Sequence, residues 1–432
     1  MKVMIIGSGG REHALACKAA ASARVEQIFV VPGNAGTARE PKVSNVALAI
    51  DDFDALTAFA REQQIGLTIV GPEAPLVAGL VDHFQANGLP CFGPGKGASQ
   101  LEGSKAFTKD FLARHNIPTA AYGNFTELAP ALDYLRQQSL PIVIKADGLA
   151  AGKGVIIAQT LEEAEATVRD MLAGNSFGSA GHRVVIEEFM VGEEASFIVM
   201  VDGRTALPFA SSQDHKARDD GDKGPNTGGM GAYSPAPVVN AEIHTRIMDE
   251  VIMPTVRGMA AEGNTYVGFL YAGLMIGADG TPKVVEFNCR FGDPEAQPIM
   301  LRLQTDLIDL CEAALAGTLD RQAIAFDPRA AVGVVLVAGG YPDRYAKGKP
   351  IHGLDTPAPA NSKLFHAGTR LDDQGQVLTN GGRVLCATAL GDTVADAAAT
   401  AYALASNITW EGVYYRKDIA WRAIAREQSA DI

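Results

Sequence analysis

Cysteine is scarce in this chain, which contains only Cys17, Cys91, Cys289, Cys311 and Cys386. The five lie far apart and form no CxxC pair, a pattern that excludes a disulfide framework and a structural zinc site and favours a reducing compartment. No apolar run reaches the roughly 20 residues of a membrane-spanning helix, and the first residues have no signal-peptide pattern. We therefore expect a soluble, cytoplasmic protein.

Positive charge is also in short supply. Lys and Arg number 37 against 50 Asp and Glu, which gives a formal net charge of −13, and no basic block or stripe offsets it. This balance argues against nucleic acid as the main partner. An anionic small molecule would have to be bound by a few local Lys and Arg side chains and backbone N–H groups.

The 432 residues are enough for two to four domains of roughly 100–200 residues each. Short apolar strands alternate with helices over the first hundred residues, which predicts a parallel sheet covered on both faces. From residue 104 the pattern changes to hairpins, with a long polar loop over 211–235. From about 330 it suggests a small mixed domain closed by a helix over 393–406. The fold class is therefore α/β, with an α+β middle part, and domains at 1–103, 104–325 and 326–432.

The opening "MKVMIIGSGGREHALA" begins like a dinucleotide-binding domain, with a strand that runs into Gly7, Gly9 and Gly10. The G-x-G-x-x-G fingerprint needs a third glycine where Glu12 stands, and an acidic residue at the end of the second strand, which ends instead in "VVPGN". We expect a phosphate site at the helix N-terminus without a dinucleotide. A tight turn that binds nothing is the alternative.

Three further motifs lie in the central region. In "KADGLAAGKGV", a glycine-rich hairpin follows Lys145 and would close over nucleotide phosphates, although an ordinary glycine hairpin explains it about as well. In "IEEFMVGEE", a strand end at 187–188 leads into a segment that could recognise an adenine edge, with Glu194 near the ribose. A solvated acidic strand end is the simpler interpretation of that motif.

The third motif is "VVEFNCRFGDPE". Strand alternation places Glu286 and Asn288 on one face, where a carboxylate and an amide oxygen suit Mg²⁺. Arg290 shares this face if the strand continues, and could bind a carboxylate through two hydrogen bonds. The alternative is a polar strand end with a surface ion pair. The eight histidines show no metal-ligand spacing.

The order of these motifs, together with "PGNAGT", "GPE", "SSQDHK" and "GPNTGGMGAYSP", resembles the phosphoribosylamine–glycine ligases, a family of the ATP-grasp superfamily, over essentially the whole chain. The resemblance implies a carbon–nitrogen ligase of de novo purine biosynthesis. Such an enzyme converts ATP, glycine and 5-phosphoribosylamine into glycinamide ribonucleotide, ADP and phosphate through a glycyl phosphate. One departure, Ala217 followed by Arg218 after "DHK", leaves the role of Arg218 open.

The resemblance also implies site residues. The implied catalytic residues are Lys105, Lys145 and Arg290. The implied ligands of Mg²⁺ or Mn²⁺ are Glu286 and Asn288. The implied ATP-binding residues are Lys105, Lys145, Gly148, Gly152, Lys153, Gly154, Glu187, Glu188, Phe189, Val191 and Glu194. The implied substrate-binding residues are Gly7, Gly9, Gly10, Arg11, Asn34, Gly36, Thr37, Glu73, Asp214, Lys216, Asn226, Thr227, Gly228, Gly229, Arg290, Asp293 and Glu295.

The expected partners are glycine and 5-phosphoribosylamine, with no nucleic acid or membrane, in a monomer or weak dimer whose segment 120–192 acts as a mobile lid. Three alternatives stay open: another ATP-grasp ligase, a nicotinamide-dependent oxidoreductase, and a nucleotide sensor without catalysis. The missing fingerprint residues disfavour the oxidoreductase. The presence of both metal-ligand candidates and both lysines disfavours the sensor.

Overall fold

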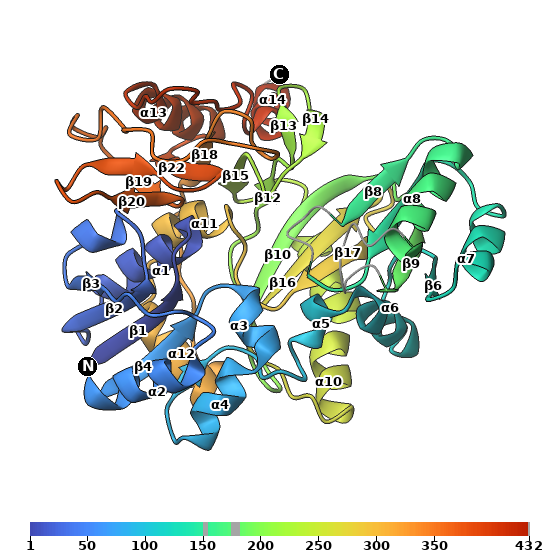
Figure 1. Ribbon diagram of the computed structural model, residues 1–432, viewed down its shortest axis with the longest axis horizontal. Coiled ribbons are helices and arrows are strands. Elements are labelled where there is room, and N and C mark those ends of the chain that lie inside the picture. Colours follow the sequence, from blue (N-terminus) through green and yellow to red (C-terminus); the bar gives the residue numbers. More distant parts are fainter. Residues whose placement is uncertain (150–153, 174–181, 431–432) are drawn as a thin grey trace.

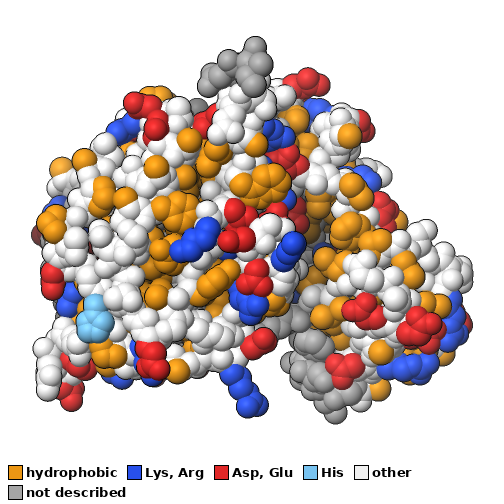
Figure 2. Space-filling view, turned by 90° about the horizontal axis from the view of Figure 1, so that it is seen from above, with side chains coloured by type: hydrophobic (Ala, Val, Ile, Leu, Met, Phe, Trp, Pro, Cys, Tyr) orange, Lys and Arg blue, Asp and Glu red, His pale blue; other side chains and the backbone are white. Residues whose placement is uncertain are grey.

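The structure is a computed structural model that describes residues 1–149, 154–173 and 182–430. Among these residues, no helix has the length and apolar character needed to cross a bilayer. On the face shown in Figure 2, Lys and Arg side chains are interspersed with Asp and Glu rather than gathered into one stripe.

The N-terminal part is a parallel five-stranded sheet in the order β3-β2-β1-β4-β5 (Figure 1). Its strands are β1 (Lys2–Gly7), β2 (Gln27–Pro32), β3 (Val43–Asn45), β4 (Ile65–Val70) and β5 (Cys91–Phe92). The helices of this part are α1 (Gly10–Ala20), the 3₁₀ turn η1 (Thr37–Arg39), α2 (Phe53–Glu62), α3 (Glu73–Ala78) and α4 (Leu80–Ala86). Val3 and Ile5 of β1 belong to one apolar core, whereas Met4 and Ile6 belong to another. Both faces of the sheet are thus covered, which confirms the expected parallel α/β start.

Two antiparallel sheets form the middle part. One has the order β6-β9-β7-β8 and a core of its own, with Ile144 and Val168 fully buried. Its strands are β6 (Tyr122–Phe125), β7 (Ile142–Ala146), β8 (Val155–Ala158) and β9 (Val184–Glu188), packed against α7 (Leu128–Leu135) and α8 (Leu161–Ala173). The other has the order β11-β10-β16-β17, with β10 (Glu193–Asp202), β11 (Ala206–Pro208), β16 (Val267–Ile276) and β17 (Pro282–Asn288). The two sheets lie side by side in Figure 1.

Helices connect and support these sheets. They are α5 (Gln100–Gly103), α6 (Lys105–Arg114), α9 (Ala241–Arg246), the π-helical turn η3 (Ile247–Ile252), α10 (Met253–Ala261), α11 (Ala296–Arg302), α12 (Leu307–Ala316) and the 3₁₀ turn η4 (Leu319–Arg321). Ser104 caps α6 by accepting a hydrogen bond from the N–H of Phe107 at 3.1 Å. This cap begins the helix at Lys105 and so fixes where that lysine projects.

The C-terminal sheet has the order β12-β15-β18-β22-β19. It combines β12 (Gln213–Asp214) and β15 (Gly231–Ser234) with β18 (Ala330–Val337), β19 (Ser362–His366) and β22 (Arg383–Gly391). Two hairpins and two helices complete this part: β13 (Ala217–Asp219) with β14 (Lys223–Asn226), β20 (Thr369–Leu371) with β21 (Val377–Thr379), α13 (Val394–Ser406) and α14 (Trp421–Ala430). The segment expected to be a long polar loop therefore contains four strands, two of which extend the C-terminal sheet. Its many polar and glycine residues concealed this pairing.

A buried polar network joins the first and last parts of the chain. The His366 N–H donates to Nδ1 of His13 at 2.7 Å, so the proton of neutral His13 lies on Nε2, which faces Glu40 Oε1 at 2.9 Å. Lys363 pairs with the same Glu40 oxygen at 2.7 Å. Burial lowers the pKa of His13 and lowers that of His366 to about 3, so both rings are neutral at pH 7.

His13, Cys17 and Glu40 place their ligand atoms within 4.8 Å of one another, as in a metal site. A cation on Nε2 of His13 would force the ring proton onto Nδ1, where it would meet the His366 N–H. Burial also raises the pKa of the Cys17 thiol, which opposes formation of the thiolate that metals bind. The hydrogen bonding therefore favours a structural role for this cluster.

This network makes stability sensitive to acid. The unfolded chain protonates its histidines near pH 6.5, whereas the folded chain keeps His13 and His366 neutral to lower pH. Stability should thus be full above pH 6.5 and fall below it, by up to about 1.4 kcal/mol per pH unit for each histidine. Thermal unfolding at pH 7.5 and 5.5 should show a smaller acid shift for His366→Asn than for the unaltered chain. The exposed control His352→Gln should keep the full shift, and an equal shift in His366→Asn would contradict the assignment.

Candidate functional site

The glycine turn after β1 is filled by the protein's own carboxylate. Gly7 has φ +124°, and a Cβ there would lie 2.5 Å from Cγ of Glu12. The Gly9 N–H donates to Glu12 Oε2 at 2.6 Å, and a side chain at Gly71 would also collide with Glu12. The expected phosphate site relied on free N–H groups at this helix N-terminus. The Gly9 N–H is not free, because Glu12 closes the start of α1.

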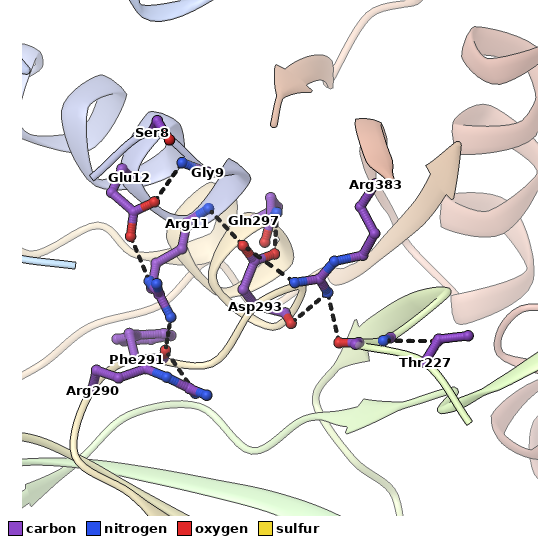
Figure 3. A network of polar contacts seen from close by, with 12 residues as sticks. Ser8, Gly9, Arg11, Glu12, Thr227, Arg290, Phe291, Asp293, Gln297 and Arg383 are labelled. Atoms are coloured by element: carbon purple, nitrogen blue, oxygen red, sulfur yellow. Dashed lines mark hydrogen bonds and ion pairs between the residues drawn. The ribbon is translucent and has the colours of Figure 1, made fainter. Parts of the chain in front are cut away.

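Asp293 joins three parts of the chain (Figure 3). Its Oδ2 accepts a hydrogen bond from the Arg11 N–H at 3.4 Å, and its Oδ1 accepts one from Gln297 at 3.0 Å. Nη1 of Arg383 donates to the backbone oxygens of Asp293, at 2.7 Å, and of Gly228, at 2.6 Å. Burial alone would raise the pKa of Asp293, but Arg383 and Arg11 hold it below its ordinary value. Arg383 was not predicted, because nothing in its local sequence links it to this site.

Two adjoining cavities lie at this junction. The larger, of about 590 Å³, is lined by Ser8, Gly9, Pro32, Gly33, Asn34, Ala35, Asn45, Asp293, Ala367, Gly368, Thr369, Arg370, Leu371, Asn380, Gly381 and Arg383. The smaller, of about 350 Å³, is lined by Gly7, Ser8, Gly9, Arg11, Glu12, Pro32, Leu48, Ala49, Ile50, Pro72 and Asp293. The larger cavity thus lies between the N-terminal and C-terminal parts, a common location for a small-molecule site.

Several residues expected to bind substrate either use their polar groups within the protein or lie outside the two cavities. Asn34 uses its whole amide: Nδ2 donates to the backbone oxygens of Ser8 and His366, and Oδ1 accepts from the N–H groups of Gly36 and Thr37. Gly36 lies so close to the ring of His366 that a Cβ would be 2.6 Å from it. Gly10, Gly36, Thr37 and Glu73 line neither cavity.

Buried lysines flank Glu187 on the nucleotide side. Glu187 lies 2.9 Å from Nζ of both Lys145 and Lys109, and Lys145 also donates to the Val285 oxygen at 3.2 Å. Burial lowers the pKa of Lys109 to about 8. Lys105 donates to the Gly148 oxygen at 2.7 Å. Lys109 was not predicted from the sequence, although it stands one helical turn after Lys105 on the same face of α6.

A second charged cluster surrounds Glu286. Lys216 lies 3.1 Å from Glu194 Oε2 and 3.9 Å from Glu286 Oε1, so β10, β17 and the segment after β12 meet here. Burial alone would raise the pKa of Glu286, but Lys216, Lys145 and Lys105 hold it below its ordinary value. Burial raises the pKa of Asp214 to about 8. Positively and negatively charged side chains therefore surround the ionised carboxylate of Glu286.

Glu286 and Asn288 fit a divalent cation. They lie two residues apart on β17, opposite Gly273 and Tyr271 of β16. The Asn288 Nδ2 donates to Glu102 Oε1 and to the Phe287 oxygen, at 3.1 Å each, which commits the nitrogen to protein acceptors and leaves Oδ1 as a possible ligand. A carboxylate and an amide oxygen form a donor set that suits Mg²⁺.

Glu102, which was also not predicted from the sequence, positions the end of β17. Its Oε2 accepts from the Cys289 N–H at 2.8 Å, and its Oε1 lies 3.2 Å from Nη2 of Arg290. Nε of Arg290 contacts Glu73 at 3.3 Å, and both carboxylates raise the pKa of Arg290 against the effect of burial. Burial raises the pKa of Glu102 itself. Glu102 stands 187 residues before Cys289, so no local pattern could have linked the two.

The loop 226–229 is held by hydrogen bonds to two regions. The Thr227 hydroxyl donates to the Lys216 oxygen at 2.8 Å and accepts from the Gly229 N–H at 3.0 Å. The Gly228 N–H donates to the Tyr341 hydroxyl at 2.9 Å, whereas the side chain of Asn226 is exposed. This loop therefore connects the cluster around Glu286 with the C-terminal part.

The remaining expected residues have varied surroundings. The buried carboxylate of Glu295 accepts from the Ser196 hydroxyl at 2.9 Å. Glu188 accepts from the Ala121 N–H at 3.2 Å. In the segment after β9, Phe189 is 39% and Val191 84% exposed, so both could contact a ligand. The Gly154 oxygen accepts from the Ala146 N–H at 2.8 Å, whereas Gly152 and Lys153 lie outside the described residues.

Comparison with known proteins shows the family of this chain. Family models match three consecutive ranges: phosphoribosylglycinamide synthetase, N domain, over 1–102; its ATP-grasp (A) domain over 103–296; and its C domain over 331–422. This chain belongs to the phosphoribosylglycinamide synthetase family. The phosphoribosylamine–glycine ligase of Vibrio cholerae is 68% identical over 429 residues, which are 99% of this chain and 100% of that protein. That of Escherichia coli strain K12 is 67% identical with the same coverage.

Solved structures agree with the family assignment. The crystal structure of phosphoribosylamine–glycine ligase from Thermotoga maritima aligns with a TM-score of 0.85 and 35% identity, covering 97% of this chain and 100% of that one. The biotin carboxylase domain of Hydrogenobacter thermophilus 2-oxoglutarate carboxylase, solved with MgADP and bicarbonate, has a TM-score of 0.71 at 16% identity. It covers 96% of this chain and 91% of that one, and indicates a shared fold. The match over 103–296 is to an ATP-grasp domain, and MgADP is bound in that biotin carboxylase structure.

Glu102 should act as a positioning residue. Glu102→Gln removes the charge that holds Arg290. Its single amide oxygen also cannot accept from both the Cys289 N–H and Nδ2 of Asn288, so the orientation of Asn288 is weakened. We expect the affinity for the divalent cation to fall by about 10- to 100-fold. Isothermal titration of Mn²⁺ in the presence of ADP measures this directly. The exposed control Glu62→Gln should bind as the unaltered chain does, and unchanged Mn²⁺ binding by Glu102→Gln would refute the role.

Proposed function

We propose that this chain ligates glycine to 5-phosphoribosylamine, with ATP converted to ADP and phosphate, and that it thereby forms glycinamide ribonucleotide in de novo purine biosynthesis. The observation that carries this proposal is the continuity of segment 286–293. Glu286 and Asn288, the candidate metal ligands, stand at its start, and Asp293, in the wall of both cavities, stands at its end. A nucleotide site and a second small-molecule site thus share one short piece of backbone.

The first step is phosphorylation of glycine. Its carboxylate attacks the γ-phosphorus of ATP, the bond to the ADP oxygen breaks, and glycyl phosphate and ADP form. Phosphoryl transfer depends on positioning and charge neutralisation rather than on a protein nucleophile. Lys105 and Lys145 would neutralise phosphate oxygens, and Arg290 would bind the glycine carboxylate. A bound Mg²⁺, or Mn²⁺, held by Glu286 and Asn288 would neutralise further phosphate charge.

The second step forms the carbon–nitrogen bond. The amine of phosphoribosylamine attacks the carbonyl carbon of glycyl phosphate, the carbon–oxygen bond to phosphate breaks, and the amine loses a proton. Water would hydrolyse the acyl phosphate, so the site must close. We assign closure to segment 120–192, which contains a sheet with a core of its own. Loop 226–229 with Asp214 and Lys216, and Glu295 behind it, would border the reacting groups.

The nucleotide base and ribose would lie at the segment after β9. Phe189 and Val191 offer exposed apolar surface to a base, and backbone groups of 187–191 could bind its edge. Glu194 would reach the ribose, and Gly148 with Gly154 would frame the hairpin over the phosphates. Phosphoribosylamine would occupy the two cavities bounded by Gly7, Gly9, Arg11 and Asn34.

We further propose three functional units at 1–103, 104–325 and 326–432, in a monomer or weak dimer. All five cysteines are free thiols, which agrees with a place in the reducing cytoplasm.

A product assay tests the function. The chain, incubated with Mg²⁺, ATP, glycine and freshly made phosphoribosylamine, should release one ADP for each glycinamide ribonucleotide formed. Omission of glycine should stop ADP release. ADP release that required a different carboxylate would support another ATP-grasp ligase, nucleotide binding without turnover would support a sensor, and saturable NADH binding would support an oxidoreductase.

Glu286→Ala should lower kcat for phosphoryl transfer by about 100-fold or more, the scale of a lost electrostatic stabiliser. The reason is that Lys216, Lys145 and Lys105 stabilise the ionised form of Glu286, which this variant removes. Rapid-quench measurement of ADP formation checks this step, with the exposed Glu242→Ala as control. Near-normal rates at ordinary Mg²⁺ would argue against the metal assignment.

A further inference from the structure

The larger cavity has an uneven charge distribution. Three charged side chains line it: Asp293, Arg383 and Arg370. Arg383 already donates to the Gly228 and Asp293 oxygens and lies 3.7 Å from the Asp293 carboxylate. Arg370, on β20, makes no hydrogen bond or ion pair with its side chain to any residue within the described ranges. The positive charge of Arg370 is therefore uncommitted.

Across the cavity, at the glycine turn after β1, several donors are already used. The Gly9 N–H donates to Glu12 and the Arg11 N–H faces Asp293. The guanidinium of Arg11 is also used, by Glu12 Oε1 at 2.6 Å and by the Phe291 oxygen at 3.1 Å. A dianion placed against the glycine turn would meet the Glu12 carboxylate, which lies 1% exposed within that turn. Because Arg11 already pairs with Glu12, its charge is not available to a phosphate at this turn.

The β20–β21 hairpin is built to hold Arg370 at the cavity. A Cβ on Gly368 would lie 2.5 Å from Cα of Gly381, so the two ends of the hairpin pack backbone against backbone. The Asn380 N–H donates to the Gly368 oxygen at 2.7 Å, which fixes this contact. Asn380 also lines the cavity, and its side chain makes no hydrogen bond within the part of the chain that the structure describes. The hairpin thus contributes a cation and an amide to the same cavity.

We propose that Arg370, with Asn380, binds the phosphate monoester of the ribosyl substrate. A guanidinium matches the geometry of phosphate oxygens and can donate two parallel hydrogen bonds to them. The ribose then lies toward Ser8 and Gly9, and the glycine turn, closed by Glu12, contacts hydroxyl groups instead of the phosphate. This inference rests on the proposed function for the identity of the substrate, but the phosphate preference of the cavity can be measured separately.

Arg370→Gln should raise KM for phosphoribosylamine by about 10- to 100-fold, the effect of a lost hydrogen bond to a charged group. The values of KM for ATP and glycine should stay within twofold, because the nucleotide side contains no part of this hairpin. Arg370→Lys should recover part of the loss, since it restores charge without the planar fork. Arg257→Gln, at an exposed position on α10, is the matched control and should be unchanged.

Protection from thermal unfolding by stable substrate analogues separates this proposal from the proposed function. Ribose 5-phosphate should protect the unaltered chain from thermal unfolding at concentrations at least tenfold lower than ribose does. Arg370→Gln should lose that preference while it keeps the same unfolding midpoint without ligand. Loss of this preference in Arg370→Gln supports the phosphate subsite, whether or not the chain makes glycinamide ribonucleotide. Failure to make glycinamide ribonucleotide would refute the proposed function and leave the subsite supported. Product formation with an unchanged KM and an unchanged preference in Arg370→Gln would overturn the subsite.

Discussion

The arrangement of this protein depends on the carboxylate and backbone oxygen of Asp293. Through them, the start of α1 and the start of β22 are held at one point, at distances of 2.7–3.7 Å. Arg383, at the start of β22, in turn donates to the Gly228 oxygen in the loop before β15 at 2.6 Å. Hydrogen bonds in which one partner is charged are stronger than those between two neutral groups. They fix the N-terminal and C-terminal parts relative to the central part, and the cavity between them owes its shape to this contact.

Glu102 has a comparable effect on the nucleotide side. It binds the backbone of Cys289 and the side chains of Asn288 and Arg290, so one largely buried carboxylate orients a candidate metal ligand and a candidate carboxylate-binding residue together. The four residues between Asn288 and Asp293 connect this strand end to the cavity wall. Two reactions in sequence need such coupling, because an acyl phosphate formed at one place must meet an amine held at another.

Glu12 fills the turn that the opening glycines form. They form the same tight strand-to-helix turn as in a dinucleotide-binding domain, but the space that such a ligand would use is taken by the Glu12 carboxylate. The turn serves as a rigid cavity edge. Uncommitted positive charge appears instead on Arg370, in a hairpin more than 350 residues later in the chain. An anion site in this molecule is thus built by tertiary contact and not by a local motif.

The sequence by itself determined the α/β start, the antiparallel centre, the family and the pairing of Glu286 with Asn288 on one strand face, because periodicity and short motifs record local geometry. It did not reveal that the segment 211–235 contains strands of the C-terminal sheet, since polar and glycine residues hide strand pairing. It also could not reveal Glu102, Arg370 or Arg383. These side chains reach the site through contacts between distant segments, and only the tertiary structure decides which charges are already paired and which are left for a ligand.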